Sequence, residues 1–362
     1  MDGRPQAVAD TVAVSAAAGT AQLRREFTFR LLIIAAILAA GAVLWSLSTL
    51  FLLVFASILV ALLLRGISEP LARLLSLPQP WALGFTVLFF IVVPLATALL
   101  FGATVAHQFS GLVERMPVSL QSLETQLDLP PDWQDWIGAS LRNFIGISGL
   151  THLAAGATGA LGSILLAFVA GVYLAAQPAL YVRGLLALFP PSLAKQVRSF
   201  VDATGTALRH WLVGQLIIMI LVGLLTGLGA FLIGLPSWAA LGVIAGLLEF
   251  VPYVGPIATG IPATLLALPK GLETVFWTLL MIVAVQQLEG LIITPLVQRQ
   301  AVSLPPALTL FALIGMGILF GVAGVFLATP LTILLFVATR EIYLPMIRQQ
   351  RKPLQEPRTV RM

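Results

Sequence analysis

The sequence predicts an all-α polytopic membrane protein with about eight membrane segments, two of which are broken or re-entrant. Of the 362 residues, 59% are hydrophobic and only 10% are charged, whereas an ordinary soluble domain is about 25% charged. Continuous apolar runs of about 20 residues recur along the chain, and each could cross a ~30 Å hydrocarbon layer as a helix. Because these runs do not alternate with polar residues, they disfavour a transmembrane β-barrel.

Most of the apolar runs predict simple membrane spans, separated by polar connections. We expect the spans at 31–46, 49–64, 81–102, 151–177, 211–233 and 272–296. A short basic loop is expected at 65–80, and a basic amphipathic connector at 177–210. The longest polar interruption, 106–150, has apolar residues at helical spacing, which predicts an amphipathic segment at the membrane surface.

Two further apolar stretches, 236–268 and 304–338, are each too long for one straight crossing. They are interrupted near their middles, by "VPYVGP" at 251–256 and by "GMGILFGVAG" at 315–324. Interrupted apolar segments of this kind are typical of transport sites, because broken backbone at membrane depth must line a cavity or lie inside packed protein. Isolated glycine pairs elsewhere, at Gly223 and Gly227 and at Gly242 and Gly246, favour close helix packing.

The distribution of basic residues predicts cytoplasmic N- and C-termini. With eight crossings, 17 of the 20 Lys and Arg residues lie on the cytoplasmic side, and 106–150 lies outside. If the two interrupted stretches are re-entrant hairpins instead, Lys270 moves outside and Arg299 moves inside, and the count does not change. We expect a disordered cytoplasmic tail at 1–27, a transmembrane domain at 28–345 and a basic cytoplasmic tail at 346–362.

The segment "GLLEFVPYVGPIATGIP", residues 246–262, places a carboxylate and several helix breakers in an apolar environment. A helix that starts near Trp238 reaches Glu249 after about 16 Å, close to the middle of the bilayer. An ionised side chain there costs at least ~2.5–3.5 kcal/mol, so Glu249 must face protein or water, or be protonated. Pro252 and Pro256 each lack an N–H donor, and Gly255 relaxes the backbone. The segment therefore predicts a polar cavity at the midplane, and a buried Glu249 that pins helix packing is the alternative.

A second polar group of residues lies within "VQQLEGLIITPLVQ", residues 285–298. Gln286 and Glu289 are three residues apart and share a helix face. Gly290 and Pro295 loosen or end the helix after them. A second membrane carboxylate beside a break supports the cavity, although Glu289 could also be an interfacial residue at a helix end.

The sequence contains no motif that indicates enzymatic chemistry. It has no cysteine, which excludes disulfides and thiolate metal sites. It also has no phosphate-binding G-x-x-x-x-G-K-[ST], H-E-x-x-H or G-x-S-x-G motif. Three scattered histidines argue against a metal cluster. We therefore expect no enzyme activity, no cofactor and no metal, and we assign the basic composition to the positive-inside rule rather than to nucleic acid.

Four segments in order resemble the autoinducer-2 exporter (AI-2E) family of bacterial membrane proteins. These are "GQLIIMILVGLLTGLGAFLIGLP", "EFVPYVGPIATGIPA", "QQLEG" with "TPLV", and "GILFGVAGVFLATPL". The resemblance implies a secondary transporter of the bacterial inner membrane that works without ATP hydrolysis and forms homo-oligomers, most simply pentamers. It also implies either export of signalling molecules or sodium/proton antiport.

The leading hypothesis is an inner-membrane secondary transporter that exports a small polar solute or an autoinducer-2-like signalling molecule. One alternative is a Na⁺/H⁺ antiporter that uses the membrane carboxylates, and another is a structural or regulatory membrane oligomer that does not transport. The partners expected are the lipid bilayer, further copies of the chain, the solute and Na⁺ or H⁺. The predicted cavity residues are Glu249, Pro252, Tyr253, Gly255, Pro256, Gln286, Gln287, Glu289, Thr294 and Pro295.

Overall fold

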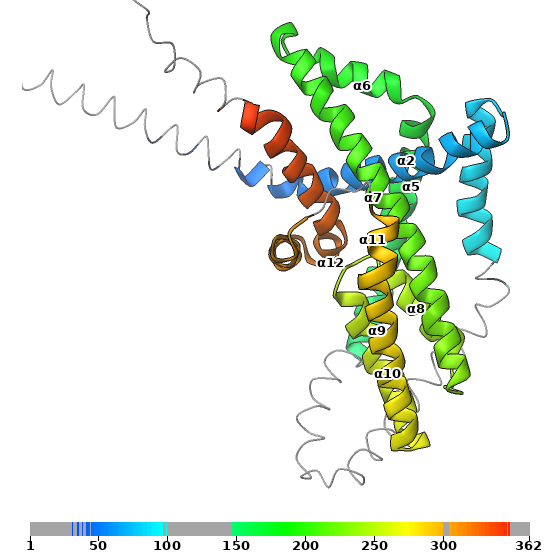
Figure 1. Ribbon diagram of the computed structural model, residues 1–362. Coiled ribbons are helices and arrows are strands. Elements are labelled where there is room, and N and C mark those ends of the chain that lie inside the picture. Colours follow the sequence, from blue (N-terminus) through cyan, green and yellow to red (C-terminus); the bar gives the residue numbers. More distant parts are fainter. Residues whose placement is uncertain are drawn as a thin grey trace, which may run out of the picture. The chain divides into compact units, whose positions relative to one another are not determined.

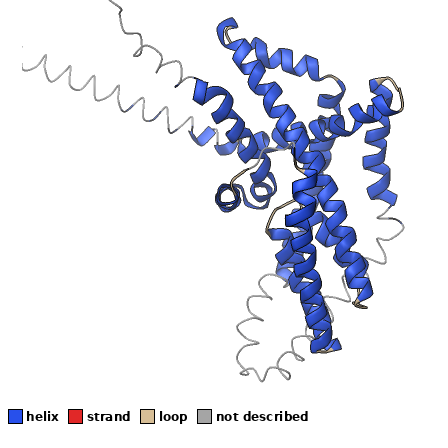
Figure 2. Cartoon of the chain, viewed as in Figure 1, coloured by secondary structure: helices blue, strands red, loops and turns tan. Residues whose placement is uncertain are grey.

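The computed structural model describes residues 45–96, 147–299 and 304–345, and isolated residues beside these ranges. The regular elements in this part of the chain are all helices (Figures 1 and 2). Of the predicted segments, the tail 1–27, nearly all of the tail 346–362 and most of 106–150 lie outside the described residues. The chain divides by its contacts into Met1–Leu52 and Leu53–Met362. The packing described below is that of the second unit.

Five of the described helices are long and apolar enough to cross a membrane. The number becomes six if Leu161–Ala176 and Pro178–Ala187, which meet at 89°, count as one span. The prediction of a polytopic all-α membrane protein is thus confirmed at the level of five or six candidate spans. The predicted number of about eight includes stretches outside the described residues.

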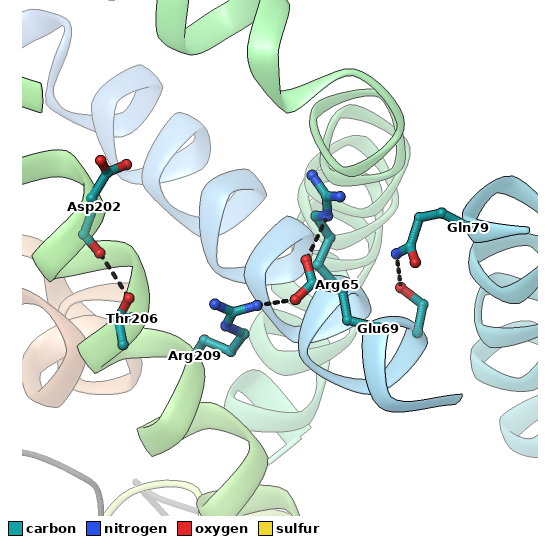
Figure 3. Close-up of polar contacts among 7 residues, drawn as sticks. Arg65, Glu69, Gln79, Asp202, Thr206 and Arg209 are labelled. Carbon is teal, nitrogen blue, oxygen red and sulfur yellow. Dashed lines mark hydrogen bonds and ion pairs between the residues drawn. The ribbon is translucent and has the colours of Figure 1, made fainter. Parts of the chain in front are cut away.

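The first well-described helix, α2, runs over Ser48–Leu74 and is longer than predicted. We expected a loop at 65–80, and this was wrong, because the helix continues through Pro70 to Leu74. Arg65 and Glu69 form an ion pair one turn apart in this part of α2, with Nε and Oε1 at 3.1 Å (Figure 3). A pair at this spacing supports a helix. The next helix, Gln79–Ala96, follows a four-residue connection.

Helix α5 spans Ile147–Ala176, and α6 follows at Pro178–Ala187. Helix α7 then runs without a break over the 42 residues of Pro191–Leu232. The predicted connector at 177–210 and the predicted span at 211–233 are therefore not separate, since the second half of the connector is the beginning of α7. A helix of this length measures about 63 Å, so it must extend well beyond a ~30 Å hydrocarbon layer.

The first interrupted stretch folds into a helical hairpin. Helix α8 covers Trp238–Leu248, and α9 covers Val254–Ala267 and ends in the short turn η1, Leu268–Lys270. Leu241, near the start of α8, packs in one buried cluster with Ala263 and Leu266, near the end of α9. In a continuous helix these residues would lie more than ~30 Å apart. The chain therefore reverses between α8 and α9, in the Pro- and Gly-rich segment predicted to break it.

The second interrupted stretch, α12 at Pro306–Ala338, is also folded back on itself. Its backbone is non-helical at Gly321, with φ 61° and ψ −144°, inside the predicted interruption at 315–324. A positive φ of this kind strongly favours glycine. Leu313 and Ala328, on either side of Gly321, pack in the same buried cluster. A π-helical turn, η3 at Thr339–Tyr343, continues the second arm.

Between the hairpins, the predicted span at 272–296 is confirmed as a helix over Leu272–Val297. It consists of α10 at Leu272–Leu288, the π-helical turn η2 at Glu289–Ile293, and α11 at Thr294–Val297. Single π-turns inside α-helices are frequent at functional sites. The π-turn here begins at Glu289, one of the two carboxylates that the sequence analysis singled out.

The tip of the first hairpin contacts the arms of the second. Val251 is buried in a cluster with Leu313 and Ala328. The ring of Phe250 stacks on that of Phe326, with centroids 6.0 Å apart, and lies edge-on to Trp211 of α7 at 5.7 Å. The first two residues after Glu249 are thus packed against α7 and the second hairpin, as is expected beside a broken backbone in a membrane protein.

Helices α7 and α8 approach each other at the glycine pairs predicted for close packing. A Cβ atom placed on Gly242 would lie 2.8 Å from the carbonyl oxygen of Gly223 and 2.9 Å from the Cα of Gly227. One on Gly246 would lie 2.7 Å from the carbonyl oxygen of Met219. The small residues therefore allow backbone-to-backbone contact between these helices.

This contact predicts that Gly242→Ala destabilises the protein. Its methyl group meets backbone atoms, which cannot move aside as a side chain can, so we expect a loss of ~1–3 kcal/mol in the free energy of unfolding. The measurement is thermal unfolding of the purified protein, followed by tryptophan fluorescence. Gly184→Ala in α6 is the matched control, because its Cβ meets nothing within 4 Å. Equal unfolding temperatures for the two variants would contradict the packing described here.

Candidate functional site

A cavity of about 620 Å³ lies where α7, the tip of the first hairpin, the α10–α11 helix and the start of α12 come together. Its lining is rich in carboxylate, amide and hydroxyl groups, and among the described residues it contains no Lys, Arg or His. The polar side chains of the lining are Gln215, Glu249, Tyr253, Gln286, Gln287, Glu289, Thr294, Gln298, Thr309 and Thr329. A cavity of this size suits a small molecule.

Nine of the ten residues predicted from the sequence line this one cavity. The structure thus brings the segment around Glu249 together with the segment around Glu289, although they are far apart in the sequence. Gly255 is the exception, and it lies behind the cavity. A Cβ on Gly255 would lie 2.9 Å from the carbonyl oxygen of Leu248 and 3.0 Å from the Cα of Glu249. The missing side chain of Gly255 allows α9 to start close to the end of α8. The transport role of all ten residues stays a prediction.

Glu249 is the residue directly after α8, and it is only 4% exposed. Its backbone carbonyl oxygen accepts a hydrogen bond of 2.7 Å from the side-chain Nε2 of Gln215 in α7. Among the described residues, no side chain or backbone group donates a hydrogen bond to its carboxylate. The main chain of Glu249 is therefore fixed to α7, while its carboxylate belongs to the cavity. This arrangement favours the predicted polar cavity over a carboxylate that pins helix packing.

Gln215 also connects α7 to the residue after α11. Its side-chain Oε1 accepts a hydrogen bond of 3.1 Å from Nε2 of Gln298. The neighbouring Gly214 makes room for this approach, since a Cβ there would lie 3.3 Å from Cγ of Gln298 and 3.4 Å from Cγ1 of Val297. The two glutamines and the Glu249 carbonyl group form a continuous hydrogen-bonded chain along one wall of the cavity.

Glu289 is positioned by the π-turn η2. The hydroxyl group of Thr294 donates a hydrogen bond of 3.0 Å to Oε1 of Glu289, five residues earlier. Five residues is the repeat of a π-turn, so the wider turn places the hydroxyl group beside the carboxylate. Glu289 and Glu249 both line this one cavity. Two carboxylates that line one cavity, with no cationic side chain among its described lining residues, attract a proton or a positively charged ion.

Several lining residues were missed by the sequence analysis. Gln215 and Trp211 lie in a helix that otherwise reads as an ordinary apolar span, and Thr309 and Thr329 come from the second hairpin. The sequence did contain one signal for Gln215, because a single amide near the start of an apolar run is costly to bury without a partner. The identity of that partner depends on the folding of segments that are distant in the sequence.

Comparison with known proteins assigns the chain to a family. The profile of the AI-2E family transporters matches residues 32–343, so the chain belongs to a family of membrane transporters. This confirms the resemblance found in the four sequence segments.

Three relatives show how far the similarity extends. The candidate transport protein YueF of Bacillus subtilis is 24% identical over 328 residues, which cover 83% of this chain and 88% of YueF. The candidate transport protein YrrI of the same organism is 30% identical over 150 residues, 41% of this chain and 42% of YrrI. A candidate transport protein of Thermotoga maritima is 34% identical over 151 residues, 41% of this chain and 46% of the relative. The latter two matches thus span less than half of the relatives' length.

The hydrogen bonds of Gln215 predict that Gln215→Ala is destabilising. The change leaves the buried Glu249 carbonyl group without this partner, which costs ~1–3 kcal/mol. It also removes the partner of Gln298, which is half-buried. Thermal unfolding of the purified variant measures the loss. Gln287→Ala is the control, because Gln287 lines the same cavity and is exposed, and its expected change is within ~0.5 kcal/mol. If both variants unfold like the wild type, the bonds of Gln215 do not hold the hairpin tip.

Proposed function

We propose that the chain is a secondary transporter of the bacterial inner membrane that exports a small polar solute, such as an autoinducer-2-like signalling molecule. The observation that carries the proposal is the cavity into which both interrupted segments bring their polar side chains. Membership of a transporter family supports the class of function. The volume of about 620 Å³ and the amide and hydroxyl groups of the lining suit a small polar solute rather than an apolar one.

Glu249 and Glu289 are the coupling groups in this proposal. A proton or a cation that binds beside these two carboxylates lowers the negative charge of the cavity lining, so binding of an ion changes the net charge of the cavity. The π-turn at Glu289 is an irregular backbone element that gives the helix local freedom next to this site. Solute export would then use the free energy of the ion gradient.

Sodium/proton antiport is the second candidate, and the same two carboxylates favour it. In that case the cavity exchanges Na⁺ for H⁺ and carries no organic solute. In either case, the lack of Lys, Arg and His in the part of the lining that the structure describes suits a cation. Whether ion movement depends on an organic solute therefore separates solute export from antiport. If the purified oligomer moves neither an organic solute nor Na⁺, the remaining alternative is a structural or regulatory role.

The proposal places the two hairpins in the membrane from opposite sides. The first hairpin begins and ends near the C-terminal end of α7, where Leu235, Leu241 and Ala267 share a cluster with Ala230. The ammonium group of Lys270 donates a hydrogen bond to the carbonyl group of Gly234 at the same end. About 35 Å away along α7 lies Arg209, which shares a second cavity with Arg73 and Arg299. This grouping supports the re-entrant arrangement, with Lys270 outside and Arg299 inside, and with both chain termini in the cytoplasm.

Accessibility to an impermeant thiol reagent tests this arrangement. The chain has no native cysteine, so single cysteines at Lys270, Arg73 and Arg299 report their own positions. We expect Lys270→Cys to react on intact cells, and Arg73→Cys and Arg299→Cys to react only after the membrane is opened. Reaction of Arg299→Cys on intact cells, with Arg73→Cys protected, would support eight crossings instead.

Neutral variants of the carboxylates test the coupling role. Glu249→Gln and Glu289→Gln keep the size of each side chain and its capacity for hydrogen bonds, and they remove the titratable group, so assembly should survive. We expect transport by inverted vesicles to fall by about tenfold, a change of ~1.4 kcal/mol, and to lose its dependence on the ion gradient. Solute and Na⁺ movement are measured in parallel, with and without a sodium gradient.

Glu273→Gln is the matched control for this experiment. Glu273 lies in the first turn of α10, outside the cavity lining, and is exposed. It should transport like the wild type. Full, ion-dependent transport by a well-expressed Glu249→Gln protein would show that the carboxylate is not the coupling group.

The proposal further places the protein in homo-oligomers, most simply pentamers. The support is the family resemblance together with the many large apolar side chains that are exposed on the single chain, among them Leu224, Phe311 and Ile318. Some of these side chains would contact lipid, and others would contact neighbouring subunits.

A further inference from the structure

A second cavity, of about 860 Å³, lies between α2, α7 and α11 and has the opposite charge character. Its charged or ionisable lining residues are Glu69, Arg73, Arg209, His210 and Arg299. Three guanidinium groups thus face one carboxylate in a single cavity, so the lining is positively charged. The proposed transport cycle uses none of these side chains.

The one carboxylate of this cavity is already occupied by two cations. Glu69 pairs with Arg65 through one oxygen and accepts a hydrogen bond from Arg209 of α7 through the other (Figure 3). These contacts fix the guanidinium group of Arg209 at the junction of α2 and α7. Arg65, Arg209 and Glu69 together still carry one net positive charge.

Arg73 and Arg299 add two further cations, and among the described residues no carboxylate pairs with either. Both side chains are exposed, one from the last turn of α2 and the other from the residues after α11. Like charges brought together on different helices repel each other, and an anion that binds between them relieves the repulsion. Guanidinium groups match phosphate oxygens because they can donate two parallel hydrogen bonds.

Apolar side chains lie on the same cavity wall as the cations. Leu74 is 81% exposed, Leu296 54% and Ile217 42%, and all three line the cavity. A free phosphate ion would make no favourable contact with these apolar side chains, whereas the acyl chains of a phospholipid would cover them. Basic pockets between transmembrane helices are typical places for anionic lipid headgroups.

We propose that this cavity between α2, α7 and α11 binds the phosphate group of an anionic phospholipid. Arg73 and Arg299 contact the phosphate, Arg209 is held ready beside them by Glu69, and Leu74, Ile217 and Leu296 contact the acyl chains. The bound lipid links α2 to the α7–α11 pair, which also forms one wall of the acidic cavity.

The experiment is lipid binding by the full-length protein in detergent, followed by native mass spectrometry. The probes are a short-chain phosphatidylglycerol, the matching phosphatidylcholine as the lipid without net charge, and glycerol phosphate and inorganic phosphate as anions without acyl chains. The test variant is Arg73→Ala with Arg299→Ala. The control is Arg183→Ala with Arg198→Ala, which also removes two arginines but from positions outside the cavity.

We expect phosphatidylglycerol to bind the wild type and the control equally and the test variant about thirtyfold more weakly, which is the effect of losing two basic residues near anionic lipid. Replacing the same two arginines by lysine should restore only part of the binding, because lysine keeps the charge but cannot donate two parallel hydrogen bonds to one phosphate. Phosphatidylcholine should bind weakly to all variants. Competition by glycerol phosphate or inorganic phosphate as strong as that of the lipid would overturn the lipid and leave a free phosphate as the ligand.

Equal binding of phosphatidylglycerol by the wild type and the test variant would overturn the site itself. Thermal unfolding of each variant without lipid separates lost binding from lost folding, and the lysine variant covers the case in which the alanine variant does not fold. None of these measurements depends on transport.

Discussion

The close contact of α7 with α8 is the constraint on which the rest of the structure depends. Helix α8 can enter and end beside α7 only because glycines face each other at Gly223, Gly227, Gly242 and Gly246, with no side chains between the backbones. In a membrane, where lipid chains are as apolar as leucine, such packing replaces the hydrophobic effect as the force that holds helices together. The contact fixes the depth at which α8 ends, and Glu249 is the residue at that end.

From that point, the positions of the other parts follow. The backbone of Glu249 is tied to Gln215 of α7, and the reversal after it is covered by the second hairpin through Phe250, Phe326 and Val251. Pro252 and Pro256 both line the cavity, which is a place where a broken backbone is tolerated in a membrane protein. The carboxylate of Glu249 is left for the cavity because the main chain, and not the side chain, makes the contact that holds the segment in place.

The sequence was sufficient where the signal is local. Pro, Gly and charged residues within apolar runs predicted the breaks at 251–256 and at 315–324, and also the polar groups around Glu249 and Glu289. The structure reverses at both predicted breaks. The sequence was insufficient where the answer depends on distant contacts. It did not predict that α7 continues through the charged residues 191–210, where pairs such as Arg198 and Asp202 lie one turn apart on an exposed face. It also did not select Gln215, whose partner Gln298 is 83 residues away.

The acidic and the basic cavity are lined by neighbouring residues of the same two helices, α7 and α11. On α7, Gly214 lines the basic cavity and the next residue, Gln215, lines the acidic one. At the end of α11, Val297 packs against Gly214 and lines the basic cavity, and the next residue, Gln298, lines the acidic cavity. The hydrogen bond between Gln215 and Gln298 therefore joins two residues of the acidic cavity whose chain neighbours, Gly214 and Val297, line the basic one. Because one side chain, Gln215, bonds both Gln298 and the Glu249 carbonyl group, a movement that separates α7 from the end of α11 acts at the same side chain that holds the main chain of Glu249.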